Sequence, residues 1–566
     1  MQSFSPNEIA RIQRKFRKFN SSGQSNEFTP PQNTPPVVPT VTPVGPVYNP
    51  QPISITEIEQ QFRDMEIREN IAMVEIPDEV VSHLKQFQVE HVQNLIYALK
   101  KHGVALDTSD TGTGKTYAAI AVAAALGLRV IINCPKAVIP NWHNVCTILD
   151  VEQLMIINYE ALRTGKYFVT LEDFLNDERT DCPYINLVRE DVVNQMTQEP
   201  ILNANGHTKT KVVDIVWSIP ENTLVIFDEA HVGKNGLNNS IPTINSKIMV
   251  MAKPQLEPQR NVYGLFLSAT ITDKLDNFDV IGYLLGLFPN YSKKSYKQFI
   301  DKLPDDHLKA IHQMLYPERA SRMDIKQIKM LTGDSQFKKN DIQAKTYTLD
   351  ASSAAEIEAA HDSIRQALTA LRQKQPVDGQ HPLVVILRAR QRIELLKIPI
   401  FVDETQTYIN AGKSVIIFVN FSETMDTIVQ KLHDANKFAS DEIDVIRGGQ
   451  SGEEREEIVQ RFQNDDIRVL VCNIEAGGVG ISLHDIHGEH ARASLISPTW
   501  KAIHLKQCLG RGYRANAKSD MTQRIIYVKS ENGEPSIEQM MCENMNEKLK
   551  NIALLNTGNL NEYQEV

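Results

Sequence analysis

The sequence has no long apolar segment and no secretory leader. A membrane span needs roughly 18 consecutive apolar residues, whereas the longest apolar run, residues 117–128, is rich in alanine and is closed by Arg129. Residues 1–6 carry neither the charged part nor the apolar part of a secretory signal. We therefore expect no membrane partner and an intracellular location, in the nucleus or the cytoplasm.

Paired cysteines and an excess of positive charge are also missing. Six cysteines are scattered over 566 residues with no C-x-x-C spacing, which argues against a disulfide scaffold or a zinc finger. The 60 lysines and arginines are outnumbered by 70 aspartates and glutamates, so the formal net charge is −10. This excludes a protein that coats nucleic acid by bulk charge, but it leaves room for a basic groove on an acidic body.

Residues 1–70 differ from the rest of the chain in composition. The stretch 30–52 holds nine of the 27 prolines and two P-x-x-P spacings. Such a stretch favours extended polyproline conformation and cannot bury a core. We predict a disordered tail with a possible protein partner at the proline-rich part; a short basic helix over residues 9–19 is an alternative for its beginning.

From residue 71 onward, strands and helices alternate. Continuous apolar strands separated by helices indicate parallel sheets that are covered on both faces. The expected strands are 130–134, 154–159, 224–228 and 264–268 in one series, and 414–419, 443–446, 469–472, 494–497 and 525–528 in another. The sequence therefore predicts two α/β domains.

The predicted domain boundaries follow these two series. The first domain covers 71–272 and is interrupted by a polar insertion at about 164–213, and the second covers 401–530. Helix formers dominate 273–400, the expected helical linker, and 531–566 is expected to form a helix and a polar tail. Within the linker, the cations Arg388, Arg390, Arg392 and Lys397 either contact phosphates or form a solvated face.

The sharpest local signal is a glycine-containing loop ahead of a helix. It differs from the pattern G-x-x-x-x-G-K-[ST] only by a serine at the first position. Backbone N–H groups of such a loop bind phosphate oxygens, and the helix that follows directs its positive end at the same anion. Lys115 is expected to meet the β and γ phosphates, and Thr116 to bind Mg²⁺. The candidate nucleotide-binding residues are Ser109, Asp110, Thr111, Gly112, Thr113, Gly114, Lys115 and Thr116.

A second signal is the sequence D-E-A-H at the end of an apolar strand, residues 228–231. Metal-assisted phosphoryl transfer needs two carboxylates at such a position. Asp228 would hold Mg²⁺, and Glu229 would orient and deprotonate the attacking water.

With these motifs the chain resembles the superfamily 2 helicase-type ATPases. The segment 84–88 is similar to the adenine-reading Q motif, which implies that Gln88 contacts the base of ATP. Trp142, Tyr159 and Lys234-Asn235 are typical of the Swi/Snf-like branch, whereas Ser268-Ala269-Thr270 departs from that branch's form of motif III.

The second domain carries further motifs of the same family. Gly480 lies in a segment that resembles motif V, and residues 507–514 fit the form Q-x-x-G-R-x-x-R of motif VI. The resemblance implies that Gly480 contributes to the nucleotide site and that Arg511 and Arg514 reach the γ-phosphate. It also implies that His231, Ser268 and Thr270 couple hydrolysis to movement.

The resemblance implies two RecA-like domains that use ATP and Mg²⁺ to move on nucleic acid. We expect an ATP-dependent DNA helicase or translocase, with DNA favoured over RNA by Trp142 and Lys234-Asn235. An RNA helicase is the nearer alternative, and a non-catalytic recruitment scaffold on the same fold is a second one. The compact organisation also resembles helicase-like proteins of large DNA viruses, for which a place in the virion is an option.

Overall fold

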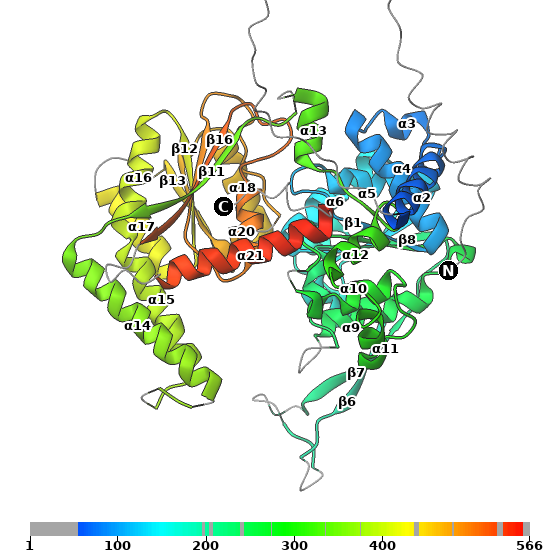
Figure 1. Ribbon diagram of the computed structural model, residues 1–566, viewed down its shortest axis with the longest axis horizontal. Coiled ribbons are helices and arrows are strands. Elements are labelled where there is room, and N and C mark those ends of the chain that lie inside the picture. The colour runs from blue at the N-terminus through cyan, green and yellow to red at the C-terminus, as the bar shows by residue number, and fades with distance from the viewer. Residues whose placement is uncertain are drawn as a thin grey trace, which may run out of the picture. The chain divides into compact units, whose positions relative to one another are not determined.

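The computed structural model describes residues 55–557 except 195–198, 203–205, 207, 238–242, 273, 334–335, 374, 378, 435–440, 478–479 and 529–535. The predicted proline-rich stretch and the residues after 557 lie outside the described residues. The chain divides into two units, residues 1–58 and 59–566. Apart from the first residues of helix α2, all helices and strands named below belong to the second unit (Figure 1).

The first part of this unit is built on a parallel sheet of six strands. Their order is β10 (Ala320–Ser321), β1 (Val104–Asp107), β9 (Val262–Leu267), β8 (Thr223–Asp228), β2 (Arg129–Cys134) and β3 (Gln153–Asn158). Every residue of β1 and β9 is buried, so helices and loops cover both faces, as parallel sheets require. The carboxyl ends of β1, β8 and β9 lie side by side, which brings three candidate motifs to one edge.

The helices that accompany this sheet precede, separate and follow its strands. They are α2 (Ile55–Ala72), α3 (Asp78–Val81), α4 (Gln86–His102), α5 (Lys115–Leu126), α6 (Ile139–Ile148), α7 (Tyr159–Leu162), α9 (Ile244–Ala252), α10 (Asp279–Leu284), α11 (Lys293–Ile300), α12 (His307–Leu315) and α13 (Ile325–Thr332). Short 3₁₀ turns occur at 136–138, 230–233, 253–255, 258–260 and 275–277. Helix α5 is rich in alanine and is buried along residues 118–123, so it packs closely against its neighbours.

The second part is built on another parallel sheet of six strands. Their order is β11 (Asn340–Tyr347), β16 (Met521–Val528), β15 (Arg492–Ile496), β12 (Ser414–Val419), β14 (Val469–Asn473) and β13 (Ile443–Ile446). Its helices are α14 (Ala351–Gln373), α15 (Pro382–Leu396), α16 (Ile398–Asn410), α17 (Ser422–Asp434), α18 (Gly452–Gln463), α19 (Ile474–Gly477), α20 (Ala502–Leu509) and α21 (Ile537–Thr557). The prediction of an α/β chain with two parallel-sheet domains is confirmed.

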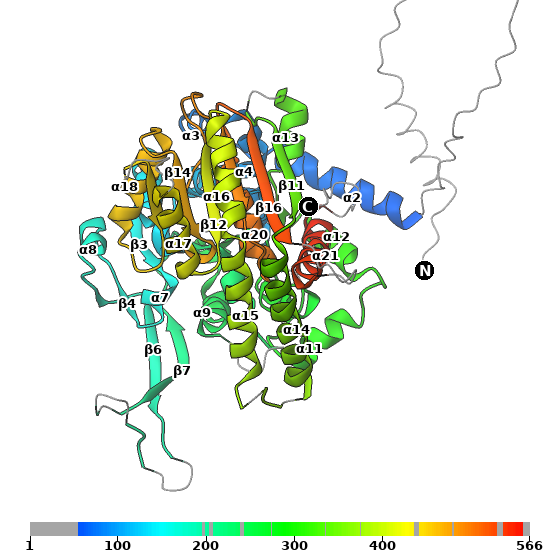
Figure 2. The same ribbon diagram turned by 90° about the vertical axis from the view of Figure 1, so that its left-hand side faces the viewer.

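The polar insertion forms two antiparallel hairpins and a short helix. Strands β4 (Lys166–Tyr167) and β5 (Thr180–Asp181) flank α8 (Leu171–Leu175), and β6 (Ile185–Asp191) pairs with β7 (Thr210–Trp217). The β6–β7 hairpin projects away from the first sheet (Figure 2). Its apolar residues gather at its base, where Ile185, Ile215 and Trp217 are buried.

Three expectations need correction. Residues 55–70 are helical, where we expected disorder, because Ile67 and Ile71 are buried on one face of α2. Strands β10 and β11 lie within the expected helical linker and complete the two sheets. Lys397 belongs to neither a solvated face nor a phosphate-binding one, since its side chain is fully buried and pairs with Glu538 at 2.6 Å.

No helix in the described part of the chain is long and apolar enough to cross a membrane.

Candidate active site

The phosphate-binding loop connects β1 to α5 as the sequence predicts. Gly112 and Gly114 have φ values of +90° and +92°, a left-handed backbone that favours glycine. Lys115 is the first residue of α5, and its Nζ donates to the carbonyl oxygens of Ser109 at 3.0 Å and Asp110 at 3.3 Å. Carbonyl oxygens of the loop therefore hold the ammonium group of Lys115, next to the positive N-terminal end of a 12-residue helix.

Gln88 supports the loop from α4. Its Nε2 donates to the carbonyl oxygen of Thr113 at 3.1 Å, and its Oε1 accepts a hydrogen bond from the backbone N–H of Lys85 at 2.8 Å. Only 3% of Gln88 is exposed. Both ends of this amide are therefore engaged with the backbone, and a contact of Gln88 with adenine stays a prediction.

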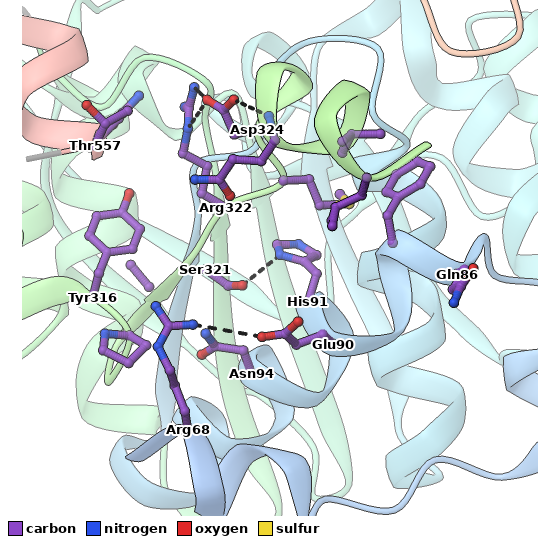
Figure 3. Close-up of a pocket in the computed structure, with 18 of the residues that line it drawn as sticks. Arg68, Gln86, Glu90, His91, Asn94, Tyr316, Ser321, Arg322, Asp324 and Thr557 are labelled. Atoms are coloured by element: carbon purple, nitrogen blue, oxygen red, sulfur yellow. Dashed lines mark hydrogen bonds and ion pairs between the residues drawn. The ribbon is translucent and has the colours of Figure 1, made fainter. Parts of the chain in front are cut away.

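The side chains of Ser109 and Asp110 hold the loop to the segment that follows edge strand β10, and a nucleotide contact of these two residues stays a prediction. The Ser109 Oγ accepts a hydrogen bond from the backbone N–H of Met323 at 2.9 Å, which gives the unusual first residue of the motif a structural role. The carboxylate of Asp110 pairs with Arg322 at 2.8 Å, and Arg322 also pairs with Asp324 at 2.9 Å (Figure 3). Burial opposes ionisation of Asp110, but the charge of Arg322, together with Lys506, the Ile325 N–H and Lys115, outweighs burial and lowers the pKa of Asp110 below its usual value.

The two carboxylates of the D-E-A-H sequence lie at the end of β8. The Asp228 carboxylate accepts hydrogen bonds from Trp142 Nε1 at 3.2 Å and from the backbone N–H of Glu229 at 2.9 Å. The hydroxyl of Tyr159 donates to the Asp228 carbonyl at 2.7 Å. Trp142 and Tyr159, which carried the resemblance to the Swi/Snf-like branch, therefore both hold Asp228 in place.

These two carboxyl groups differ in acidity. Burial and the neighbouring charge of Glu229 raise the pKa of Asp228 to about 7. Burial acts in the same direction on Glu229, but the hydrogen bond and charge of His231, with Lys115 and Arg511, outweigh it and lower the pKa of Glu229 to about 2. At neutral pH Glu229 is ionised. A further cation near Asp228 would favour the ionised form of that carboxylate.

The predicted coupling residues form one connected group. His231 Nδ1 lies 3.2 Å from Glu229 Oε2 and 3.1 Å from Ser268 Oγ. Ser268 Oγ donates to the Thr270 carbonyl at 2.9 Å and accepts from the Thr270 N–H at 3.2 Å. Since Ser268 Oγ already donates once, the N–H of His231 is the donor toward it. The structure brings these residues together as expected.

The two arginines of the second part of the chain meet the phosphate-binding loop. Arg511 Nη1 and Arg514 Nη2 both donate to the carbonyl oxygen of Ile481, at 3.1 and 2.9 Å. A Cβ atom on Gly112 would lie 2.8 Å from Arg514 Cδ, and one on Gly510 would lie 2.8 Å from Thr111 Cβ. Motif VI therefore packs directly on the loop, nearly 400 residues away in the chain.

Gly480 lies beside the segment that follows β2. Its φ is +79°, and a Cβ atom placed on it would lie 2.7 Å from Val138 Cγ1 and 3.1 Å from Ala137 Cβ. This position brings motif V against residues 137–138. The contribution of Gly480 to the nucleotide site stays a prediction.

The residues present fit Mg²⁺. Within the described residues, no group of three or more His, Cys, Asp or Glu side chains could hold a metal ion alone. Mg²⁺ takes oxygen ligands and usually keeps waters and substrate phosphates among them. A single carboxylate and a single hydroxyl, those of Asp228 and Thr116, are the donors such an ion would find here, and the raised pKa of Asp228 marks a site that a cation stabilises.

A groove of about 870 Å³ lies beside the D-E-A-H sequence. Residues of both parts of the chain line it, including Lys136, Arg163 and Arg179 of the first part and Arg455 of the second. Glu229 and His231 also line it. The groove therefore combines cations that suit a phosphate backbone with access to Glu229.

Comparison with known proteins identifies the chain's family. Residues 397–516 match the model of the helicase conserved C-terminal domain. Over 506 residues the chain is 34% identical to a protein of Acanthamoeba polyphaga mimivirus named "Putative ATP-dependent RNA helicase", and the match covers 86% of each chain. The chain belongs to the helicase family.

As a superfamily 2 helicase, the protein is an ATP-hydrolysing enzyme, and the alternative of a non-catalytic scaffold is set aside. The similarity to a viral protein agrees with the organisation noted in the sequence. The assignment to the Swi/Snf-like branch and the choice of DNA find no support in these comparisons.

Sequence reasoning missed three residues that the structure places at this site. Arg322 pairs with the loop, and Lys506 and Asn556 both contact the carbonyl oxygen of Ala269 in motif III. Lys506 directly precedes motif VI, which is the one signal that could have drawn attention to it. Nothing local marks Arg322 or Asn556, because their partners are more than 200 residues away.

Proposed function

We propose that this protein is an ATP-dependent RNA helicase. The observation that carries the motor function is the packing of Arg511 and Arg514 against the phosphate-binding loop, beside the carboxylates of Asp228 and Glu229. An arginine from a second domain stabilises the charge that spreads over the γ-phosphate in the transition state. This arrangement makes hydrolysis depend on how the two domains meet.

The roles of the other residues follow from their environments. Lys115 and the N-terminus of α5 bind the phosphates. Thr116 and Asp228 would hold Mg²⁺, which would supply positive charge to them. Glu229 accepts a hydrogen bond from the attacking water and orients it. Its pKa is lowered below the usual value, so Glu229 is ionised at neutral pH and can take a proton from that water.

The groove beside the D-E-A-H sequence is the proposed path of the polymer. Its lysine and arginine side chains come from both parts of the chain, so a phosphate backbone in the groove would contact both domains at once. Binding of the polymer would favour the closed arrangement, and hydrolysis would release it, a domain closure of the hinge class. Phosphate contacts, not base contacts, would dominate the affinity.

The choice of RNA rests on two supports. The viral relative carries the name of an RNA helicase. In addition, Trp142, one of the residues that favoured DNA, is fully buried and donates to Asp228, so it does not read a duplex. DNA remains the second candidate because Lys234-Asn235 follows the D-E-A-H sequence as in the Swi/Snf-like branch.

The test is ATP turnover of the full chain without polymer and with single-stranded RNA, duplex RNA, single-stranded DNA or duplex DNA. We expect RNA to raise turnover severalfold and added salt to abolish the effect through competition for phosphate contacts. Displacement of a labelled strand from duplex RNA then tests unwinding. Stimulation by DNA alone would replace the RNA proposal with the DNA one, and no stimulation by any polymer would refute both.

A further inference from the structure

One backbone carbonyl in motif III accepts two side-chain hydrogen bonds from the C-terminal part of the chain. The carbonyl oxygen of Ala269 lies 3.0 Å from Lys506 Nζ and 3.2 Å from Asn556 Nδ2. Lys506 lies on α20 and Asn556 near the end of α21. Two separate helices therefore deliver donors to the same atom, just after strand β9.

Ala269 lies between Ser268 and Thr270 in motif III. Ser268 connects this motif to the carboxylate of Glu229 through His231. The side chain of Ser268 bonds both to Thr270 and to His231, and His231 contacts Glu229. A shift of the Ala269 peptide would move Ser268 and hence His231. Fixing this carbonyl therefore fixes the position of His231, which lies 3.2 Å from Glu229.

Lys506 also faces the phosphate-binding loop. Its ammonium lies 3.8 Å from the carboxylate of Asp110, and the other charges that face it are Arg322, Lys115 and Asp324. Burial lowers the pKa of Lys506 to about 8, and Asp110 opposes that shift. Since an apolar side chain would avoid the cost of burying a charge here, stability alone does not account for a lysine.

Helix α21 is tied to both sheets. Near its start, Glu538 pairs with the buried Lys397, which also donates to the Ile526 carbonyl of β16 at 3.1 Å. Near its end, the Leu555 carbonyl lies 3.0 Å from His312 Nδ1 on α12. The helix thus runs from the second sheet to the first (Figure 1).

Asn556 makes an incomplete set of hydrogen bonds. It is 3% exposed, and within the described residues its Oδ1 has no partner. It lines a pocket of about 590 Å³ together with Thr557 and Tyr316 (Figure 3). A buried acceptor without a partner costs free energy, so the bond from Nδ2 to Ala269 is what favours an asparagine at this position.

We propose that Lys506 and Asn556 are positioning residues that clamp motif III in the closed arrangement, and that Lys506 links the clamp to the phosphate-binding loop. Closure of the two domains brings both donors to Ala269, and opening withdraws them. The clamp makes the orientation of His231 and Glu229 dependent on closure. The proposal rests on ATP hydrolysis by this family and not on the choice of RNA.

The experiment measures kcat and KM for ATP with the polymer that stimulates the wild-type chain most. A lost hydrogen bond of about 1 kcal/mol corresponds to roughly a fivefold effect, so Lys506→Met and Asn556→Ala should each lower stimulated kcat about fivefold or more. KM for ATP should change less than about twofold, because the phosphate contacts remain. Lys506→Arg should restore most of the rate.

Matched controls separate the clamp from general damage. Asn544→Ala removes an exposed asparagine of α21 that donates to the Met540 carbonyl of its own helix, and Lys431→Met removes an exposed lysine of α17. Both should keep wild-type kcat and melting temperature. Wild-type kcat in both Lys506→Met and Asn556→Ala would overturn the proposal, and so would equal losses in the controls.

The pH profile provides a readout that a purely structural role would not change. The ammonium of Lys506 is lost as pH rises through about 8, so stimulated kcat of the wild type should fall above that pH. In Lys506→Arg the fall should disappear, because a guanidinium stays charged over this pH range. An unchanged profile in Lys506→Arg would contradict the role of Lys506.

Discussion

Replacing Arg322 by methionine should destabilise the protein, because it leaves the carboxylate of Asp110 without its main partner. The two side chains meet at 2.8 Å with 12% and 17% of their surfaces exposed. Asp110 would keep the backbone N–H of Ile325 at 3.2 Å and the ammonium of Lys506 at 3.8 Å. Neither contact replaces a close guanidinium, so the loss should be large.

The expected cost is about 3 kcal/mol of the free energy of unfolding, the lower end of what breaking a buried ion pair costs, since both partners retain some exposure. Adding Asp110→Asn should recover the part of this cost that comes from the unpaired charge of Asp110, whereas the carboxylate of Asp324 still lacks Arg322. The pKa of Asp110 is lowered in the folded state. Its stabilisation is therefore complete above the unfolded pKa and is lost as pH falls toward the folded one, so the cost should shrink below about pH 4.

Urea unfolding followed by circular dichroism at pH 7 and at about pH 3 measures both effects. The matched control is Arg392→Met, which breaks an ion pair with Glu356 whose side chains are 53% and 45% exposed. Exposed pairs contribute about 1 kcal/mol or less. If Arg322→Met costs no more than Arg392→Met, the role of Asp110 as an anchor of the loop is refuted.

The remaining predictions concern catalysis and the tail. Glu229→Gln should still bind a fluorescent ATP analogue but should lower single-turnover hydrolysis about 10²-fold or more; a normal rate would remove Glu229 from the reaction. Arg511→Ala and Arg514→Ala should each lower stimulated kcat by about 10³-fold with ATP binding retained, and near-normal rates in both would remove the second domain from the site. Deletion of residues 1–54 should leave ATP turnover and melting temperature unchanged, whereas deletion of 1–72 should lower the melting temperature, because it removes the buried face of α2; scanning calorimetry decides between them.

The sequence was most informative where the chemistry is local. A strand such as β8 is continuously apolar and is followed by a pair of carboxylates, so a few consecutive residues indicate both its burial and its function. The phosphate-binding loop and motif VI could be predicted for the same reason. That Arg511 and Arg514 meet the loop followed from the family resemblance, since no local pattern joins residues so far apart.

Long-range pairs escaped prediction because either partner alone looks ordinary. The neighbouring cations in the sequence indicate a basic helix face that includes Lys397. Its partner Glu538, however, lies 141 residues away, and both side chains are buried. Arg322 and Asp110 are 212 residues apart. Strand β10 has two residues, too few for any periodicity, and β11 is polar along much of its length, because it lies at the edge of its sheet.

The balance of charge at the site argues that nucleotide and metal ion bind together. Arg322 is committed to Asp110 and Asp324, and Lys506 to Asp110 and motif III. The cations left to face a nucleotide are Lys115, Arg511 and Arg514, against the carboxylates of Asp228 and Glu229. This small positive excess is too little for the polyphosphate of free ATP, and a bound Mg²⁺ would both reduce that negative charge and favour the ionised form of Asp228. We therefore expect ATP without Mg²⁺ to bind much more weakly than the complex, and binding of a fluorescent analogue with and without a chelator measures the difference.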